Sequence, residues 1–299
     1  MVVNNIYMQK ENILIVGASG FVGKALTRSM LETNSKVFLT SRDKSFKIKG
    51  AKVFYGDLND IVFCKKILKN IDVVYYLASY KKNIAVHTKI PFEVLAKNVT
   101  PLITFLEAVK VSKVKKIVYT SSSIVEYFSL TDNVVDGYVY GKYINESIIK
   151  SFVSENKTPI TIVRSAAVYG PGNDFNPDTA NLIPSLIIKA IEAKDEMVLW
   201  GKGTRRLQFI YIDDLVHNLI AVKDRKEETI TVGNPMPVSI KKVLQIILAQ
   251  LDKKLKISHD LTKPDKKTQL TKFNNIVKPK IDLKEGIMRT LEFYIQKDA

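Results

Sequence analysis

The sequence predicts an α/β protein: a doubly wound parallel sheet followed by a smaller C-terminal α/β subdomain. Short apolar, β-branched runs alternate with helical stretches through the first half of the chain. This order produces parallel strands with helices on both faces. The strand-like runs are apolar at consecutive positions, which is typical of strands buried on both sides. Turn residues become frequent after Val168. We therefore expect domains at residues 1–168 and 169–299, with some later strands rejoining the first sheet.

The pattern predicts each element in order. Strands are expected at residues 12–16, 36–40, 52–55, 73–77, 116–120 and 159–163, and helices at residues 21–33, 91–111 and 136–154. Proline opens the second of these helices, a position that suits its fixed φ angle. The second part predicts helices at residues 182–193, 215–222 and 240–251, and strands at 197–200 and 209–212. The lysine-rich region 253–280 is expected to form a surface loop.

Charge and composition exclude several classes of protein. The formal net charge is +16, yet only seven of the 46 basic residues are arginine and the lysines are scattered. This favours solvated side chains over a nucleic-acid surface, although the charge could attract an anionic substrate. His87, His217 and His259 show no metal-ligand spacing, so no metal is expected. A single cysteine, no membrane-length apolar run and no signal-like start predict a cytoplasmic protein with no membrane partner.

A glycine-rich loop follows the first strand and opens the first helix. Glycines let the backbone turn tightly and approach a pyrophosphate, which the N–H groups and dipole of a helix N-terminus attract. The spacing GxxGxxG predicts a Rossmann-type, NAD(P)-binding first domain. The residues expected to hold the cofactor here are Gly17, Ser19, Gly20, Phe21, Val22 and Gly23.

The end of the second strand bears on the choice between NAD and NADP. An acidic residue there bonds the ribose 2′-hydroxyl of NAD, whereas an arginine accommodates a 2′-phosphate. This chain has Thr40 and Ser41, and then Arg42. The pattern favours NADP over NAD, with Asp43 as the residue that could still serve NAD. Asp57 ends the third strand, where it could reach the adenine or simply form a turn.

A tyrosine and a lysine lie four residues apart on the 136–154 helix. Tyr138 and Lys142 therefore share one face of that helix. A nearby ammonium is expected to lower the phenol pKa from about 10, so that proton exchange becomes feasible at neutral pH. Ser123 follows the fifth strand, at the edge of the sheet where ligands bind. We interpret Ser123, Tyr138 and Lys142 as a catalytic set.

These motifs resemble those of the extended short-chain dehydrogenase/reductase family, the NAD-dependent epimerase/dehydratase group. The likeness extends over nearly the whole chain. Residues 72–78 resemble the family's DVVxHLA strand, 98–108 its NVxGTxNLLEA helix, 118–123 its VYxSSS, and 164–172 its RxxNVYGPG. Glu146 follows Lys142 as in YxxxKxxxE, and residues 201–215 are similar to GxGxxRxFxxVDD.

The resemblance implies further site residues. Toward the cofactor these are Asp57, Leu58, Leu77, Ala78 and Asn98. Toward the substrate they are Ser122, Ser123, Asn181, Arg205 and Arg206. There are departures: Leu207 stands where the family has its diphosphate-clamping arginine, so Arg205 or Arg206 would have to replace it. Ile124 and Val125 follow Ser123 where the family's dehydratases have Asp-Glu, so 4,6-dehydration is not expected.

The function implied by the resemblance is hydride exchange at a carbon, C4, of a nucleotide-linked sugar in carbohydrate biosynthesis. Two outcomes share this machinery: a nucleotide-sugar epimerase that recycles its cofactor, and an NADPH-dependent reductase of a 4-keto sugar. Arg42 favours the reductase and the general likeness the epimerase. A third hypothesis is a non-catalytic NADP-binding regulatory protein. The intact catalytic set argues against it. The family also suggests a homodimer formed through the two long helices.

Overall fold

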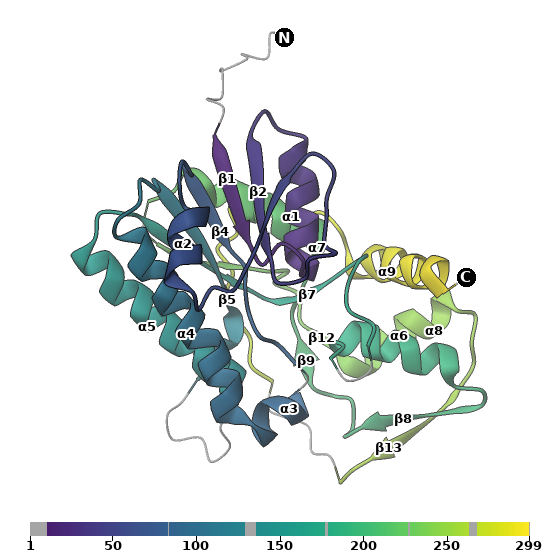
Figure 1. Cartoon of the computed structure of the whole chain (residues 1–299). Coiled ribbons are helices and arrows are strands. Elements are labelled where there is room, and N and C mark those ends of the chain that lie inside the picture. Colours follow the sequence, from purple (N-terminus) through teal and green to yellow (C-terminus); the bar gives the residue numbers. More distant parts are fainter. Residues whose placement is uncertain are drawn as a thin grey trace.

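A seven-stranded parallel sheet forms the centre of the protein (Figure 1). The computed structural model describes residues 11–82, 84–128, 136–176, 179–226, 228–262 and 268–298. The strand order is β11-β6-β5-β4-β1-β2-β3, so the order reverses between β1 and β4, and ligands bind at such switch points. These strands are β1 (Asn12–Val16), β2 (Lys36–Ser41), β3 (Lys52–Tyr55), β4 (Val73–Tyr76), β5 (Lys116–Ser122), β6 (Ile160–Ser165) and β11 (Thr229–Val232). The predicted doubly wound α/β class is confirmed.

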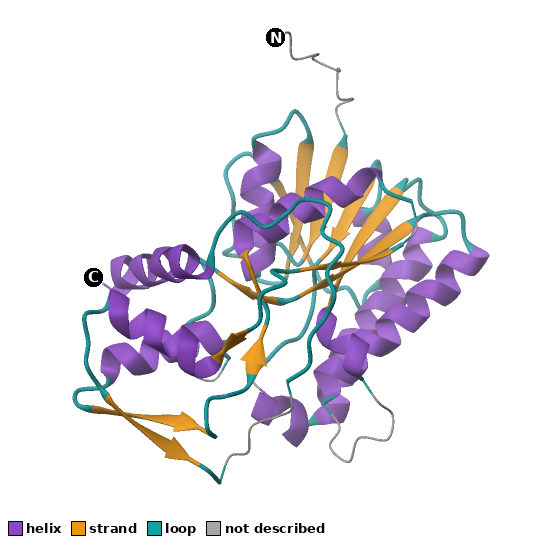
Figure 2. Cartoon of the chain, turned by 180° about the vertical axis from the view of Figure 1, so that it is seen from behind, coloured by secondary structure: helices purple, strands orange, loops and turns teal. Residues whose placement is uncertain are grey.

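Helices cover both faces of the sheet, and this explains the continuous apolar strands. In β1, Ile13 and Ile15 join the core under α1 (Phe21–Leu31) and α7 (Ile212–Ala221). The alternate residues Leu14 and Val16 join the core under α2 (Ile61–Ile67), α4 (Pro91–Val109) and α5 (Gly137–Glu155). Each such side chain contributes roughly 1.5–3 kcal/mol on burial. Both layers are visible in Figures 1 and 2.

The C-terminal part is built from short sheets and three helices (Figure 2). β7 (Ala167–Tyr169) pairs with β10 (Phe209–Tyr211), β9 (Arg206–Leu207) with β12 (Val238–Ser239), and β8 (Glu196–Trp200) with β13 (Lys256–Asp260). The helices are α6 (Leu182–Glu192), α8 (Ile240–Gln250) and α9 (Leu283–Asp298). β11 returns to the first sheet and pairs parallel with β6.

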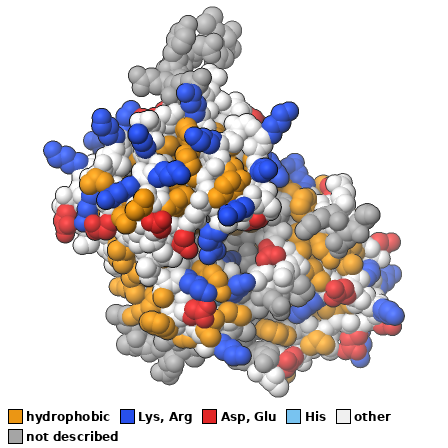
Figure 3. Space-filling model, viewed as in Figure 1, with side chains coloured by type: hydrophobic (Ala, Val, Ile, Leu, Met, Phe, Trp, Pro, Cys, Tyr) orange, Lys and Arg blue, Asp and Glu red, His pale blue; other side chains and the backbone are white. Residues whose placement is uncertain are grey.

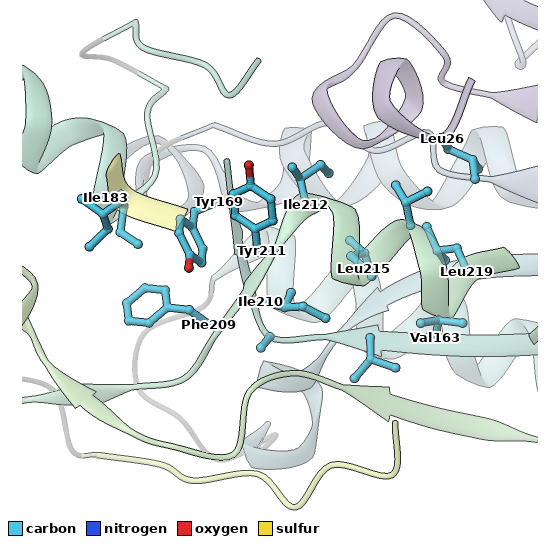
Figure 4. Packing of buried hydrophobic residues seen from close by; sticks show 14 of the residues in the cluster. Leu26, Val163, Tyr169, Ile183, Phe209, Ile210, Tyr211, Ile212, Leu215 and Leu219 are labelled. Atoms are coloured by element: carbon cyan, nitrogen blue, oxygen red, sulfur yellow. The ribbon is translucent and has the colours of Figure 1, made fainter. Parts of the chain in front are cut away.

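One apolar core continues from the first sheet into the C-terminal part. Leu26 of α1 and Val163 of β6 belong to the same buried cluster as Tyr169, Ile183 and Phe209 (Figure 4). Packing therefore fixes the C-terminal part against the sheet. It also fixes the position of the residues on the predicted substrate side relative to the first domain.

The structure corrects some expected elements. The region 253–280 was expected to be loop, but β13 (Lys256–Asp260) lies within it and pairs with the half-buried strand β8. Charged and apolar residues mix in β13, so its strand conformation comes from tertiary pairing rather than from local preference. α7 begins at Ile212 rather than at residue 215. The short helices α3 (Ile84–Lys89) and η1 (Ser123–Tyr127), and the C-terminal α9, were not predicted.

Basic side chains are spread over the face shown in Figure 3 rather than gathered in one stripe. No described helix is both long and apolar enough to cross a membrane. In the part of the chain that the structure describes, no group of three potential metal ligands comes together.

Candidate active site

The glycine loop is closed by backbone contacts that only glycine permits. Gly17 has a φ of +84°, and a Cβ there would lie 2.7 Å from the Ala78 backbone nitrogen. A Cβ at Gly23 would lie 2.4 Å from the Gly17 carbonyl oxygen. The Gly17 N–H donates to Thr40 Oγ1 at 3.2 Å. The loop is thus clamped between the ends of β2 and β4.

The N-terminus of α1 is open toward this loop. Gly20 is its N-cap and supplies no side-chain capping bond, and both Ser19 and Gly20 are exposed. Phe21 and Val22 form the first turn, so their backbone N–H groups face outward without an intrahelical acceptor. Such N–H groups and the helix dipole bind a diphosphate. The loop therefore fits a dinucleotide cofactor.

The end of β2 offers an exposed cation, Arg42, and a carboxylate, Asp43, that is engaged through one of its oxygens, Oδ1. The Asp43 carboxylate accepts hydrogen bonds from the Ser45 hydroxyl (2.6 Å) and the Ser45 N–H (2.8 Å). These bonds lower the pKa of Asp43. Arg42 is exposed beside it. At the end of β3, exposed Asp57 bonds Asn59 and is followed by half-buried Leu58.

The segment after β4 is held by a buried amide. Asn98 on α4 is 5% exposed; its Oδ1 accepts from Ser79 Oγ (2.8 Å) and from the Tyr80 N–H (2.9 Å). Its Nδ2 donates to the carbonyl oxygens of Tyr80 and Val94. Asn98 thus acts on the loop that follows Leu77 and Ala78. Its side chain is saturated by protein groups, so any effect on a cofactor runs through that loop.

Asp136 and the end of β5 position the tyrosine and the lysine. Asp136 caps α5 by accepting the backbone N–H groups of Tyr138 (3.0 Å) and Val139 (3.2 Å). Lys142, one turn later and 3% exposed, donates from Nζ to the Thr120 carbonyl at 2.8 Å. Its Nζ lies 5.9 Å from the centre of the Tyr138 ring.

Ser122 and Ser123 end and follow the strand whose backbone holds Lys142. Ser122 ends β5, and half-buried Ser123 begins η1 directly after it. Because Lys142 bonds the backbone of Thr120 in the same strand, the structure brings the predicted catalytic set to the carboxyl end of β5.

The prediction that Lys142 lowers the pKa of Tyr138 is wrong for the protein without a ligand. Burial raises the pKa of Tyr138 to about 12, and the neighbouring Asp136 adds to this effect. Burial lowers the pKa of Lys142 to about 7, opposed by the Glu146 carboxylate. A low-dielectric site disfavours both charged forms, and this outweighs the mutual stabilisation of phenolate and ammonium. The tyrosine therefore holds its proton firmly at neutral pH.

An ion pair between half-buried Arg164 and buried Glu146 holds the helix that carries Tyr138 and Lys142. Arg164 of β6 binds Glu146 of α5 with both its Nε (3.0 Å to Oε1) and its Nη2 (2.5 Å to Oε2). The Ser121 hydroxyl donates to the same carboxylate at 2.5 Å. This network fixes α5 against β5 and β6, and so fixes the depth of Lys142.

On the side of the predicted substrate site, Asn181 of the C-terminal part contacts the first domain. It is the N-cap of α6, and its Oδ1 accepts from Lys81 Nζ at 2.5 Å. Lys81 was not identified from the sequence; its place just after the β4 end was the available signal. Exposed Arg206 donates from Nη2 to the Pro237 carbonyl at 2.9 Å, and half-buried Arg205 precedes it in the same segment. Arg206 is thus held within the β9–β12 region.

Proteins of known structure share this fold, and curated proteins are similar in sequence. A reductase of Streptomyces sp, dTDP-4-dehydro-6-deoxy-D-allose reductase, is 25% identical over 85% of each chain. The crystal structure of a Thermotoga maritima UDP-glucose 4-epimerase with UDP-glucose matches with a TM-score of 0.85 at 20% identity, over 96% of this chain and 100% of that one. A Thermus thermophilus UDP-glucose 4-epimerase in complex with NAD matches with a TM-score of 0.81 at 17% identity, over 95% of this chain and 99% of that one.

A family model matches residues 13–233, which include the glycine loop, the Ser–Tyr–Lys set and all seven strands of the main sheet. The chain belongs to the NAD dependent epimerase/dehydratase family.

Proposed function

We propose that this chain is a nucleotide-sugar epimerase that exchanges a hydride at C4 of the sugar with NAD(P). The proposal rests on one observation: Tyr138 and Lys142 lie at the carboxyl end of β5, on the sheet edge where the open N-terminus of α1 also lies. In an open α/β sheet, this edge is where a dinucleotide and a substrate can meet.

The side chains divide the work around the reacting oxygen. When bound, the nicotinamide cofactor accepts or supplies the hydride. The Tyr138 phenol holds a proton at neutral pH and exchanges it with the sugar oxygen as the carbon changes oxidation state. The Ser123 hydroxyl orients that same oxygen. Lys142, held in place by Thr120, provides N–H donors beside the phenol, and its protonation sets the local charge.

The nucleotide part of the substrate would lie across the boundary of the two parts. Lys81 and Asn181 already meet there, and an ammonium beside the N-terminus of α6 suits a diphosphate. Similarity to a reductase of a dTDP-linked sugar and to an epimerase bound to UDP-glucose supports this class of substrate. With Leu207 in the clamp position, Lys81 is the cation best placed to take over, with Arg205 and Arg206 as the alternatives foreseen from the sequence.

A second candidate function follows from the end of β2. Thr40 Oγ1 accepts the Gly17 N–H, and Ser45 engages one oxygen of Asp43. Exposed Arg42 is then the group at this strand end that suits a 2′-phosphate. We propose that NADP is preferred, and NADPH consumption is typical of a 4-keto nucleotide-sugar reductase. A non-catalytic NADP-binding protein is the remaining alternative.

Product analysis separates these functions. Purified protein is incubated with a panel of nucleotide sugars, including 4-keto derivatives, with each cofactor, and products are identified by mass spectrometry and sugar chromatography. An epimerase yields an isomer of unchanged mass and consumes no net cofactor. A reductase yields a product two hydrogens heavier and oxidises one NADPH for each turnover. Absence of turnover on the whole panel would favour the regulatory reading.

The catalytic tyrosine is tested by Tyr138→Phe, with Tyr143→Phe as the matched control on the same helix. Tyr143 is 37% exposed and packs on Phe128. Loss of one proton-transfer group is expected to lower kcat by about 10²–10⁴-fold in Tyr138→Phe, while Tyr143→Phe keeps the parent rate. Equal activity of the two variants contradicts the assigned role.

The cofactor preference is tested by Arg42→Ala, with the exposed Lys44→Ala as control. Losing a hydrogen bond to a charged phosphate costs about 1.5–3 kcal/mol, or roughly 10- to 100-fold in affinity. We expect the KM for NADPH to rise by that factor and the KM for NADH to stay constant. A parallel change in both KM values rules out 2′-phosphate recognition by Arg42.

We further propose that the protein is a cytoplasmic homodimer of carbohydrate biosynthesis that associates through α4 and α5. Ile103 of α4 (44%) and Tyr143 of α5 (37%) expose apolar surface on these two packed helices. Light scattering after gel filtration measures the mass directly, and a monomer at micromolar concentration would exclude a stable dimer.

A further inference from the structure

His87 is a buried histidine that the proposed mechanism does not use. His87 lies on α3, between the end of β4 and the start of α4, and is 4% exposed. Its ring lies flat against the Tyr138 ring: the centroids are 5.2 Å apart and the planes are inclined by 14°. This distance and inclination are those of an offset aromatic stack.

Two contacts fix the imidazole in its plane. Nε2 accepts the Lys82 backbone N–H at 2.9 Å, so this nitrogen carries no proton. In the neutral ring the proton is therefore on Nδ1, which faces Asp136 Oδ1 at 3.5 Å. The ring is thus held at both of its nitrogens, and its flat face is left for the tyrosine.

Asp136 joins the histidine and the tyrosine through one oxygen. The same Oδ1 accepts the Tyr138 and Val139 N–H groups at the start of α5. Tyr138 is consequently located twice, through its backbone by Asp136 and through its ring by His87. Replacing the histidine by a small residue would leave one face of the phenol without a partner.

The imidazole is neutral at neutral pH. Burial lowers the pKa of His87, an effect that the nearby Lys81 increases and the Asp136 carboxylate opposes. Protonation at Nε2 would also remove the acceptor of the Lys82 N–H. His87 is thus a flat, uncharged plate rather than a second acid or base.

We infer that His87 is a positioning residue for Tyr138: it fixes the plane of the phenol and so the direction of its oxygen. The inference rests on the proposed function, because orientation matters only if the Tyr138 oxygen exchanges a proton with substrate. The competing explanation is that His87 merely packs α3 against α5 and contributes only stability.

The test compares His87→Ala, which removes the plate, with His87→Phe, which keeps a flat ring but loses both nitrogen contacts. His217→Ala is the matched control, since His217 is an exposed histidine of α7. We expect His87→Ala to lower kcat by about 10- to 100-fold, the scale of a misplaced catalytic group, with KM values within about twofold. His87→Phe should recover most of kcat, and His217→Ala should match the parent chain.

Two further measurements distinguish positioning from stability. In a Tyr138→Phe background, His87→Ala should change the residual rate by less than about threefold, because coupled residues are not additive. In protein with ¹³C-labelled tyrosine rings, the Tyr138 NMR signal is assigned by its loss in Tyr138→Phe. It should shift in His87→Ala and remain ring-shifted in His87→Phe.

The outcomes separate this inference from the proposed function. An unchanged Tyr138 signal in His87→Ala, or an equal loss of rate with and without Tyr138, overturns the role of His87. If the parent chain turns over no nucleotide sugar, the proposed function fails, and an unchanged Tyr138 signal in His87→Ala would still overturn the ring contact on which the role of His87 depends.

Discussion

Replacing Lys142 by methionine should make the protein more stable in mild acid and nearly abolish its activity. Lys142 is 3% exposed, and no carboxylate is among its hydrogen-bond acceptors, the Thr120 carbonyl and the Tyr119 hydroxyl. Burying an ammonium in this way opposes folding. Methionine has a similar length and fills the same space without a charge.

The size of the effect follows from the lysine pKa. Burial lowers it from 10.5 to about 7. Between these two values the unfolded chain binds more protons than the folded chain, so the free energy of unfolding rises with pH. For a single group with these two pKa values, linkage gives about 2–3 kcal/mol more stability at pH 9 than at pH 6. The stability gained through deprotonation of Lys142 is therefore lost as the pH falls toward 7.

Urea denaturation at pH 6 and pH 9 measures the effect, because other titrating groups cancel when parent and variant are compared at each pH. Lys142→Met should lack the rise of about 2–3 kcal/mol attributable to this lysine. At pH 6 the free energy of unfolding of Lys142→Met should also be higher than that of the parent. The loss of the hydrogen bond to Thr120 makes this difference smaller. Exposed Lys150 lies two turns further along α5, and Lys150→Met should follow the parent at both pH values. A parent–variant difference that is the same at pH 6 and pH 9 refutes the reasoning.

Two further predictions concern the supports of the site. Gly23→Ala places a Cβ against the backbone at Gly17. It should lower the free energy of unfolding by about 1–3 kcal/mol. By contrast, Gly20→Ala meets only ordinary contact, so it should keep its stability in urea yet weaken binding in a dinucleotide titration. Glu146→Ala removes the hydrogen-bonded carboxylate from half-buried Arg164, which keeps only its longer contact with Glu126 (3.7 Å). The loss should lower the free energy of unfolding by about 1–3 kcal/mol in a urea titration. The exposed Glu155→Ala on the same helix serves as control, and equal losses in the two variants contradict the assignment.

The sequence predicts the sheet and the glycine loop because both depend on local pattern. Continuous apolar runs mark strands buried on both sides, and glycine spacing reflects close contacts within one turn of chain. Gly17 is a partial exception: the backbone that excludes its Cβ belongs to Ala78, 61 residues further along the chain. Neither β13 nor the contact of Lys81 with Asn181 could be predicted, since both depend on distant segments meeting.

The electrostatics of the site were beyond the sequence for a related reason. The spacing of Tyr138 and Lys142 correctly places them on one helix face, but the sign of a pKa shift depends on solvent access as well as on neighbours. Burial at this site raises the pKa of the tyrosine and lowers that of the lysine. His87 was recognised only as a residue without metal-ligand spacing, because its stacking on Tyr138 joins two separate helices.

These shifts have a common consequence for the chemistry. Tyr138, Lys142 and His87 are all displaced by burial toward their uncharged forms. Because these three side chains are shifted toward their uncharged forms, they respond strongly to charges that a ligand brings: the low dielectric that disfavours ionisation also strengthens each new interaction. An anion near Lys142 would raise the lysine pKa, and a cation near Tyr138 would lower the phenol pKa. The protonation state needed for turnover would then be set by what is bound, and the proton would become mobile only in the complex that can use it.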